Sequence, residues 1–452
     1  MLPFLNFVKK ILQPGVSSSK PAQPRVYPRP EHTISRAQIS PNALKVLYRL
    51  KKAGFRACLV GGCVRDLLLG REPKDFDVAT DAHPEQVREL FRNCRLVGRR
   101  FRLAHIRFGR EIIEVATFRG VAALGREGDW AQEETGRLLR DNVFGTIEED
   151  AWRRDFTVNA LYYDIADFSV IDYVGGMEDL RQGVLRLIGD PERRYREDPV
   201  RMLRAVRFMT KLGFTLDSAC DRPLSRLTPL LADIPPARLY EEVLKLFLSG
   251  CAVQTFERLR QYGLFAYLFP ATDEALAQEH HGFPLTFLVR VLDNTDRRLN
   301  EGKAVTPYFL YAALLWEPVR LEAQRRQEAG SAPVVAMQEA ASEILSVQIR
   351  HVAIPRRISL PMREVWTLQP RFERRQGGRP FRLLSHPRFR AAYDFLLLRS
   401  EAGEAEPALA DWWTQFQQAD ENERRKMLEK PRRKRRRRPR QRKGAKQTSV
   451  ST

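Results

Sequence analysis

The spacing of the apolar residues changes partway along the chain, and this change most limits the folds open to it. As far as residue 175, apolar residues form short runs that end at glycines, such as Ala57–Val60 before Gly61-Gly62. Short runs bounded by turn residues are typical of buried strands. From Asp198 onward the apolar residues lie mostly three or four positions apart, as in helices. The pattern predicts a mixed α/β N-terminal region followed by an all-helical remainder.

Local signals divide the α/β region further. A helix is expected over residues 41–50, with Ser40 as its cap and proline in its first turn. A second short strand is expected over residues 76–79, and a hairpin over residues 102–118 that turns at Gly109. These elements predict a mixed sheet flanked by helices.

Changes in composition suggest where one segment gives way to the next. Residues 14–30 are rich in proline and serine, which predicts a disordered arm. Residues 120–140 are polar and lack a periodic apolar face, which predicts a loop near a site. We expect an N-terminal arm over residues 1–35, an α/β head over 36–175, a helical neck over 176–270, a helical body over 271–420 and a disordered tail over 421–452.

The net charge of the 452-residue chain is +21, and much of it lies near the C-terminus. Arg432 to Lys446 holds eleven basic residues and no acidic one, which leaves +10 on the rest. A field of this sign attracts polyanions, of which nucleic acid is the commonest. An acidic membrane surface is the alternative partner for the tail.

Other features of the composition bear on the compartment. Five irregularly spaced cysteines without a CxxC pair argue against a disulfide framework or a zinc site and fit a reducing cytoplasm. No run of about 18 uncharged apolar residues is present, so no transmembrane helix is expected. Met1–Leu12 is apolar with two lysines near its end. It predicts either a short amphipathic helix at the inner-membrane surface or a frayed terminus, on an otherwise cytoplasmic protein.

Gly61-Gly62, between an expected strand and an expected helix, forms the first candidate site. Glycines let backbone N–H groups approach phosphate oxygens, and the helix N-terminus adds partial positive charge. Arg65 is a candidate for a fork-shaped phosphate contact. The alternative is an ordinary tight turn.

Asp75 and Asp77 form the second candidate site. On a strand, side chains two residues apart share a face, so the two carboxylates would project together. Paired carboxylates repel each other unless a cation lies between them, and hard oxygen ligands suit Mg²⁺. Two magnesium ions held in this way can activate an attacking hydroxyl and neutralise a leaving pyrophosphate.

Two residues are candidates for a third carboxylate. Glu114 interrupts the otherwise apolar run Ile112–Ala116, where a charge is costly unless paired or metal-bound. Asp155 follows Arg153 and Arg154, whose guanidinium groups are candidates for holding a triphosphate. For both carboxylates the alternative is a buried salt bridge.

A fourth candidate site lies at the start of the helical part. Asp198 and Arg201 are three residues apart and therefore neighbours on one helix face, which Arg204 continues. A pair that carries donors and acceptors can hydrogen-bond the edge of a nucleotide base. The alternative is a solvated helix face with an ion pair.

Taken together, the motifs GGCVRD, KDFDV, EVATFR, RRDFTVNAL and EDPVRMLRAVRF resemble the class II nucleotidyltransferase family in their order and spacing. This family comprises tRNA CCA-adding enzymes and bacterial poly(A) polymerases. The resemblance is strong over residues 40–270. It implies a DNA-polymerase-beta-like nucleotidyltransferase head, with a helical neck that binds the nucleotide base and RNA and a helical body that binds RNA.

The resemblance also implies roles for the candidate residues. Asp75 and Asp77 match the metal-binding catalytic pair, and Asp155 ranks ahead of Glu114 as the third active-site carboxylate. The base-reading pair is Asp198 and Arg201. Further nucleotide contacts are implied at Gly61, Gly62, Arg65, Asp66, Arg153, Arg154 and Arg204, with Glu197 orienting the base-reading pair.

Within the family, residues 96–106 and the basic tail resemble the poly(A) polymerase branch. The implied reaction is template-independent addition of AMP from ATP, with two Mg²⁺ ions, to the 3′ ends of largely unselected single-stranded RNA. Such tailing promotes RNA decay, so the RNA-decay machinery is an expected partner. A CCA-adding tRNA nucleotidyltransferase is the alternative, and a noncatalytic RNA-binding protein on the same fold is the second alternative.

Aromatic and basic residues also alternate late in the chain. Phe372 precedes Arg374, Arg379 precedes Phe381, and Phe389 precedes Arg390. One hypothesis is that these residues hold single-stranded RNA by stacking and charge. The alternative is that the aromatics belong to the core.

Overall fold

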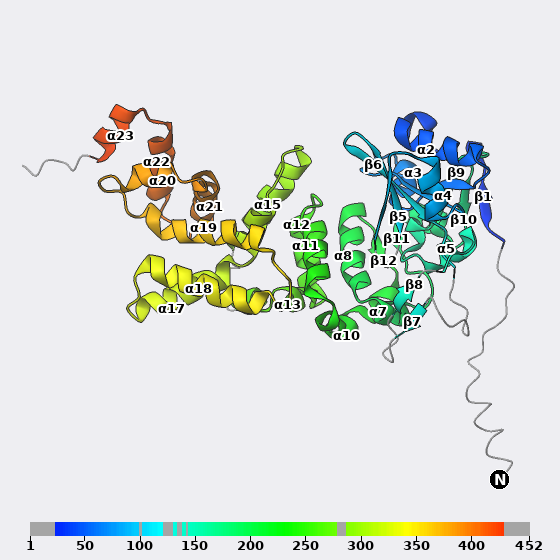
Figure 1. Ribbon diagram of the computed structural model, residues 1–452. Helices are drawn as coiled ribbons and strands as arrows, with labels where there is room; N and C mark the ends of the chain where they lie inside the picture. Colours follow the sequence, from blue (N-terminus) through cyan, green and yellow to red (C-terminus); the bar gives the residue numbers. More distant parts are fainter. Residues whose placement is uncertain are drawn as a thin grey trace, which may run out of the picture.

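The computed structural model describes residues 23–98, 102–120, 130–132, 138–141, 143–277 and 286–428. An α/β head lies at one end, and helices α19 to α23 lie at the other (Figure 1). Helices α8, α11 and α12 lie between the two ends. The expected class, an α/β head followed by a helical neck and body, is confirmed. No helix among the described residues is long and apolar enough to cross a membrane.

The head is built on an eight-stranded mixed sheet in the order β1-β10-β9-β2-β3-β6-β5-β4. Its neighbouring strands are antiparallel except β3 and β6, which are parallel. The strands are β1 (Arg25–Tyr27), β2 (Ala57–Val60), β3 (Asp77–Thr80), β4 (Cys94–Val97), β5 (Leu103–Phe108), β6 (Glu111–Thr117), β9 (Leu161–Asp164) and β10 (Val170–Asp172).

Helices cover both faces of this sheet because its buried strands alternate apolar side chains between the two sides. Leu59 of β2 belongs to the core under α2 and α3, whereas its neighbour Val60 belongs to a second cluster with Ile147 of α5. The cap predicted at Ser40 is present, since its hydroxyl accepts a hydrogen bond from the Asn42 amide at 3.2 Å. The head helices are α2 (Pro41–Lys52), α3 (Gly62–Leu68), α4 (Pro84–Leu90), α5 (Ile147–Arg153) and α6 (Gly176–Gln182).

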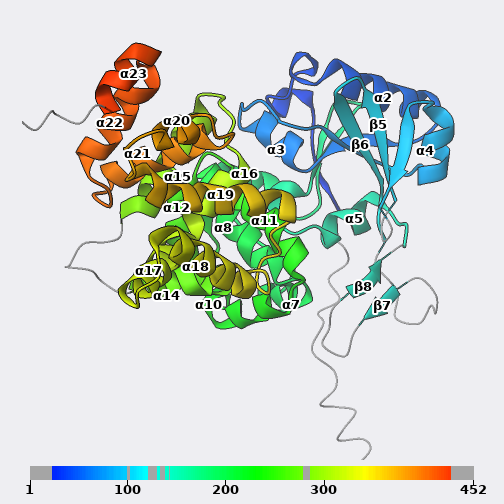
Figure 2. The same ribbon diagram turned by 60° about the vertical axis from the view of Figure 1, so that its left-hand side comes forward.

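Two predictions made from local composition are wrong in part. Arg25–Tyr27, expected within a disordered arm, forms edge strand β1, because the distant strand β10 supplies partners for its backbone (Arg25 opposite Asp172). The expected loop over residues 120–140 contains strands β7 (Trp130–Gln132) and β8 (Leu138–Asp141), which pair with each other away from the main sheet (Figure 2). Residues 1–22, including Met1–Leu12, lie outside the described residues.

The remainder of the described chain is almost entirely helical. The short strands β11 (Val184–Leu185) and β12 (Thr215–Leu216) pair at the start of the neck. The helices are α7 (Pro191–Glu197), α8 (Val200–Leu212), α9 (Ser218–Asp221), α10 (Leu224–Leu227), α11 (Pro236–Phe247), α12 (Ala252–Gln261), α13 (Leu264–Leu268), α14 (Pro270–Ala277), α15 (Thr286–Asn300), α16 (Pro307–Leu314), α17 (Trp316–Glu328), α18 (Pro333–Gln348), α19 (Arg356–Phe372), α20 (Arg379–Leu384), α21 (Phe389–Glu401), α22 (Pro407–Gln418) and α23 (Glu421–Leu428).

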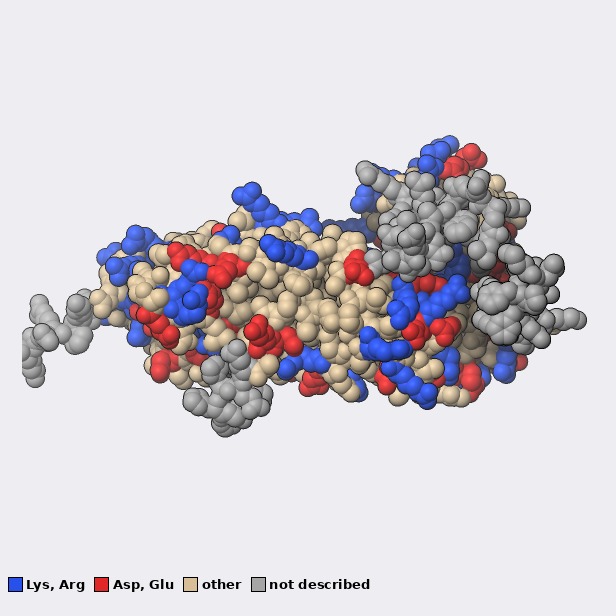
Figure 3. Space-filling model, turned by 90° about the horizontal axis from the view of Figure 1, so that it is seen from below, with Lys and Arg blue, Asp and Glu red and all other residues tan. Residues whose placement is uncertain are grey.

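Two cores hold this helical part together. The main core runs from the head into the body as far as α19 and α21. The end of α19 joins α20, α21 and α22 in a separate cluster centred on Phe372 and Trp413. On the face seen in Figure 3, basic and acidic side chains are interspersed, so the positive excess does not coat that face evenly.

Candidate active site

Strands β3 and β6 place Asp77 and Glu114 side by side. The parallel register pairs the two residues directly. Their neighbours Val78 and Val115 point into the core under α2, so Asp77 and Glu114 point to the opposite face of the sheet. Across the next strand, the Nε2 atom of His105 lies 3.4 Å from Oε1 of Glu114. The three side chains form a polar row across one face.

Asp75 lies beside this row but not on the strand. Strand β3 begins at Asp77, and Asp75 is exposed in the bend before it, so the prediction that the two carboxylates share one strand face is wrong in detail. Their charges nevertheless interact. Burial and the negative charges of Glu114 and Asp75 raise the pKa of Asp77 to about 6, although the positive charge of Arg154 acts to lower it.

The excess negative charge of this row suits a divalent cation, because carboxylate oxygens are the ligands that Mg²⁺ prefers. Among the described residues, however, no group of three or more His, Cys, Asp or Glu side chains is arranged to hold a metal ion. A cation here therefore needs further ligands from outside the described residues. Mg²⁺ commonly completes its coordination with water and substrate phosphates.

The glycine turn lies under a guanidinium group. Gly61 has φ 78°, a conformation that favours glycine, and Nη1 of Arg154 lies 3.4 Å from where a Cβ would stand. Arg154 is anchored from its other side: its Nε atom donates to the Tyr162 hydroxyl at 2.9 Å and to Oδ2 of Asp150 at 3.1 Å. Its Nη1 atom makes no hydrogen bond with the described residues. The turn and Arg154 together form a candidate phosphate cradle.

Arg65 and Asp66, for which nucleotide contacts are predicted, pair with each other in this fold. The Arg65 side chain is only 3% exposed. Its Nε donates to Oδ1 of Asp66 at 2.8 Å, and its Nη1 donates to Oδ1 of Asn159 at 2.6 Å. Gly62 begins α3 next to this network. Arg65 and Asp66 therefore brace the turn from inside the protein.

Asp155, which the sequence ranks ahead of Glu114, makes a salt bridge instead. Nε of Arg204 donates to its Oδ2 at 2.7 Å, and Nδ2 of Asn159 donates to its Oδ1 at 3.3 Å. Burial would raise the pKa of Asp155, but Arg204 holds it below the usual range. The alternative of a buried ion pair thus describes Asp155, while Glu114 is the carboxylate beside Asp77.

Arg153 and Arg154, adjacent in sequence, have different surroundings. Arg153 donates to the carbonyl of Gly120, and burial with the charges of Arg119 and Arg194 lowers its pKa to about 10. The sequence interpretation missed Arg194, whose Nη2 donates to the Arg153 carbonyl at 2.8 Å and also to the Arg154 carbonyl. Arg194 therefore fixes the end of α5 to α7.

The expected base-reading residues lie at the junction of α7 and α8. Nη1 of Arg201 lies 3.2 Å from Oε2 of Glu197, which agrees with an orienting role for Glu197. Asp198 does not pair with Arg201. It accepts from Nη2 of Arg238 on α11 at 2.7 Å, a partner 40 residues away that sequence spacing gives no means of finding.

The hypothesis of aromatic stacking on RNA is wrong for two of its three rings. Phe372 and Phe389 are buried in the second core, where each packs against Trp413. Phe381 is half-buried and packs against Phe416. The neighbouring residues Arg374 and Arg379 are exposed.

Comparison with known families and proteins agrees with this geometry. Residues 57–186 match a family model described as the poly A polymerase head domain. Residues 213–276 match "probable RNA and SrmB-binding site of polymerase A", and residues 329–446 match "polymerase A arginine-rich C-terminus".

Individual relatives divide into two groups. Poly(A) polymerase I of Salmonella typhi is 52% identical over 94% of this chain and 93% of its own. The CCA-adding enzyme of Bacillus subtilis is 39% identical but covers 50% of this chain and 55% of its own. The structure of the Bacillus stearothermophilus CCA-adding enzyme with CTP superposes with a TM-score of 0.57 at 26% identity, covering 83% of this chain and 82% of that one.

A sheet face bearing Asp77 and Glu114 beside a glycine turn, on a head of this fold, defines a nucleotidyltransferase. Similarity to poly(A) polymerases extends over nearly the whole chain, whereas similarity to the Bacillus subtilis CCA-adding enzyme is confined to half of it. The chain belongs to the poly(A) polymerase I family.

Proposed function

We propose that this chain adds AMP from ATP to the 3′ end of RNA, without a template, on the sheet face that carries Asp77 and Glu114. The observation that carries the proposal is the excess of negative charge there. Burial and the charges of Glu114 and Asp75 raise the pKa of Asp77 to about 6, beside the cationic cradle of Arg154 and Gly61. Carboxylates and a guanidinium brought together in this way suit phosphoryl transfer, whose catalysis rests on positioning and charge stabilisation.

The carboxylates would hold the metal. Asp75 and Asp77 are the proposed ligands of two Mg²⁺ ions, and Glu114 replaces Asp155 as the proposed third carboxylate. When bound, these ions lower the pKa of an attacking hydroxyl and neutralise a departing pyrophosphate. His105, 3.4 Å from Glu114, helps to fix the orientation of that carboxylate.

The ATP triphosphate would lie in the cradle of Gly61 and Arg154. Because Asp150 and Tyr162 hold Arg154 from behind, its Nη1 is fixed in place before the nucleotide arrives. Arg153 and Arg194 lie behind this cradle and add positive potential. The 3′-hydroxyl oxygen attacks the α-phosphorus, pyrophosphate leaves, and the charge that develops is shared with Arg154.

The adenine base would be read at the junction of α7 and α8. Glu197 holds the guanidinium of Arg201, and Arg238 holds the carboxylate of Asp198, so a donor and an acceptor are both oriented. The base is then recognised by polar side chains whose rotamers are fixed by ion pairs. No nucleic acid template takes part in this recognition. Arg238 is proposed as a positioning residue for Asp198.

Primer extension tests this proposal. A short unstructured RNA is incubated with Mg²⁺ and either ATP or CTP, using the native chain and the Asp75→Ala/Asp77→Ala variant. Long ladders with ATP alone that vanish in the variant are expected. Dependence on CTP and a tRNA-like end would favour CCA addition, and no extension by the native chain would favour the noncatalytic alternative.

Two further expectations concern segments outside the described residues. Contact of Met1–Leu12 with a membrane surface and the contribution of Arg432–Lys446 to RNA affinity both stay predictions. So does an association with RNA-decay machinery. Deleting residues 432–446 is expected to lower the salt dependence of RNA binding and to leave the chemical step nearly unchanged.

A further inference from the structure

Four arginines surround one open hollow whose lining residues come from α18 to α20 and the adjoining loops. Helix α20 lies at the end of the body far from the head (Figure 1). The hollow has a volume of about 370 Å³ and is lined by Arg371, Arg374, Arg379 and Arg382, with His386, Val334 and Leu383 completing it. Arg371 lies in the last turn of α19, Arg379 begins α20, and Val334 comes from α18. We call these seven residues the arginine pocket.

The arginines of this pocket lack carboxylate partners. All four are exposed, and none makes an ion pair or a side-chain hydrogen bond with the described residues. Six other arginines of the described body do pair with carboxylates, among them Arg320 with Glu317 and Arg388 with Glu364. Four like charges around one hollow repel each other, and a bound anion relieves that repulsion.

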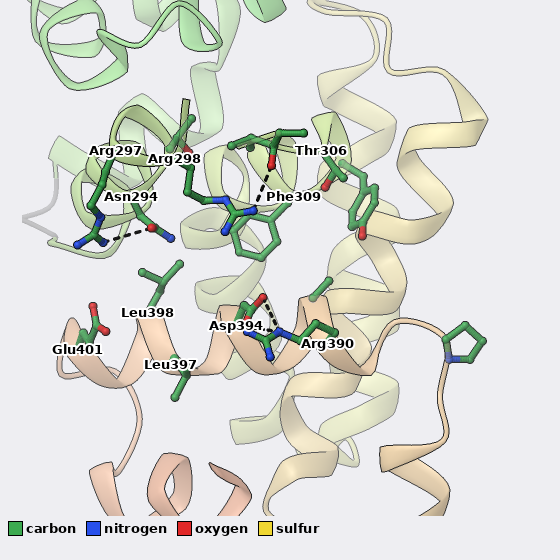
Figure 4. Close-up of a pocket in the computed structure, with 16 residues that line it drawn as sticks. Asn294, Arg297, Arg298, Thr306, Phe309, Arg390, Asp394, Leu397, Leu398 and Glu401 are labelled. Carbon is green, nitrogen blue, oxygen red and sulfur yellow. Dashed lines mark hydrogen bonds and ion pairs between the residues drawn. The ribbon is translucent and has the colours of Figure 1, made fainter. Parts of the chain in front are cut away.

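A second hollow in the body provides a contrast. It lies between α15, α16 and α21, and its basic residues already have partners (Figure 4). Arg390 pairs with Asp394 at 3.0 Å, and Arg298 donates to the carbonyl of Ala304 at 3.2 Å. The positive charge of the arginine pocket is therefore not a general property of cavities in this body.

The fold explains why these arginines face outward together. Phe372 lies between Arg371 and Arg374 and is fully buried in the second core, and Leu383 next to Arg382 is also buried. Packing of these apolar neighbours holds the backbone of α19 and α20 in place. The guanidinium groups are thereby directed to the surface around a floor of Val334 and Leu383.

We propose that the arginine pocket binds consecutive phosphates of single-stranded RNA, upstream of the 3′ end that occupies the head. The proposal rests on the proposed function, which makes RNA the substrate. The pocket suits a phosphate chain because its lining has four guanidinium forks but no aromatic side chain to stack on a base, other than the His386 ring. Binding is therefore independent of sequence.

The position of the pocket gives this proposal a specific signature. The head and the arginine pocket lie at opposite ends of the described chain (Figure 1). Only an RNA long enough to reach from one to the other contacts both. Loss of the pocket charge then weakens the binding of long RNA and leaves the binding and extension of short primers unchanged.

The experiment compares matched charge removals in the full chain. Arg374→Gln/Arg382→Gln removes two charges from the pocket, and Arg356→Gln/Arg357→Gln removes two exposed charges from the other end of α19. Binding of labelled oligoadenylates of increasing length is measured over a range of salt concentrations. The pocket variant is expected to reduce the slope of log affinity against log salt by about 1.4 for long RNA, since each phosphate contact to a single strand contributes about 0.7.

Further variants separate charge from folding. Arg374→Lys/Arg382→Lys keeps the charge and is expected to retain most of the slope, and thermal unfolding of every variant is expected to match that of the native chain. An unchanged slope in the glutamine variant, or an equal fall in the α19 control, would overturn the proposal. So would loss of short-primer extension, which would assign the two arginines to the reaction itself. Failure of the proposed function is distinguishable, because the native chain would then extend no RNA whatever the binding slopes.

Discussion

The carboxylates of the sheet face and those that pair with arginines of the neck differ in whether the fold compensates their charge. Asp77 and Glu114 lie side by side with Asp75 close by, and this mutual repulsion contributes to the raised pKa of Asp77. Where the head meets the neck, Asp155 of the head is bound by Arg204 of the neck, and within the neck Glu197 is bound by Arg194 and Arg201. Compensated charge stabilises the fold by itself, whereas uncompensated charge is relieved only when a ligand of opposite sign arrives.

The arginine pocket extends this comparison from uncompensated negative charge to uncompensated positive charge. Its guanidinium groups lack carboxylates as the sheet-face carboxylates lack cations, and the two places lie at the two ends of the molecule. One suits a divalent cation and the other suits phosphates. A carboxylate on the sheet face should therefore matter for activity, and a carboxylate paired with an arginine of the neck should matter for stability.

The largest expected effect is on catalysis by Glu114→Gln. The substitution keeps the shape of a side chain that is about half exposed and removes its charge. We expect activity with ATP to fall roughly 100- to 1000-fold, as when one charge-stabilising group is removed from an active site. The free energy of unfolding should change by no more than about 0.5 kcal/mol. Near-native extension rates in this variant would remove Glu114 from the proposed metal site.

The matched substitution where the head meets the neck, Asp155→Asn, should have the opposite effects, a large loss of stability and a small loss of activity. It leaves the Arg204 guanidinium partly buried without its carboxylate, and we expect a loss of roughly 2–3 kcal/mol in the free energy of unfolding, measured in denaturant. The double variant Asp155→Asn/Arg204→Met should be less destabilised than the sum of the single variants. If Asp155→Asn abolished extension while the protein remained fully folded, the ranking of Glu114 over Asp155 would be reversed.

Local sequence signals predicted the local elements of the head well. The Ser40 cap, the Ala57–Val60 strand and the turn at Gly109 depend on residues within a few positions of each other. Signals of this kind act through backbone preference and side-chain alternation, which a single sequence carries. The glycine turn predicted in this way is present, with Gly61 at φ 78°.

The residues that each carboxylate contacts could not be predicted, because these contacts depend on which distant elements the topology brings together. Glu114 lies beside Asp77 only through the parallel pairing of β3 and β6. Asp198 pairs with Arg238 only because α11 packs against α8. The same limit explains strand β1. Its proline-rich surroundings predict disorder, but an edge strand needs only one neighbour, and β10 supplies it.

The smallest expected effect distinguishes the two kinds of carboxylate by the sign of their pH dependence. The pKa of Asp155 is lowered in the folded protein, so its contribution to stability is present at neutral pH and is lost on acidification. The pKa of Asp77 is raised to about 6, so the folded state binds its proton more tightly than the unfolded state does. The free energy of unfolding therefore falls as the pH rises from about 4, the usual pKa of aspartate, to about 6. Above pH 6 this loss of stability stays constant.

Asp77→Asn should remove the loss of stability that the charged Asp77 carboxylate causes above about pH 6. In the presence of a chelator, the variant is expected to be more stable than the native chain by about 1–2 kcal/mol at pH 8, after allowance for partial exposure, and equally stable at pH 4. Added Mg²⁺ should then stabilise the native chain more than the variant, because a ligand that binds the folded state stabilises it according to its affinity. Thermal unfolding at the two pH values measures both effects. Two outcomes would show that the repulsion around Asp77 is already compensated within the fold: a stability difference that does not change with pH, or equal stabilisation of both proteins by Mg²⁺. The contrast between the sheet-face carboxylates and those paired with arginines of the neck would then fail.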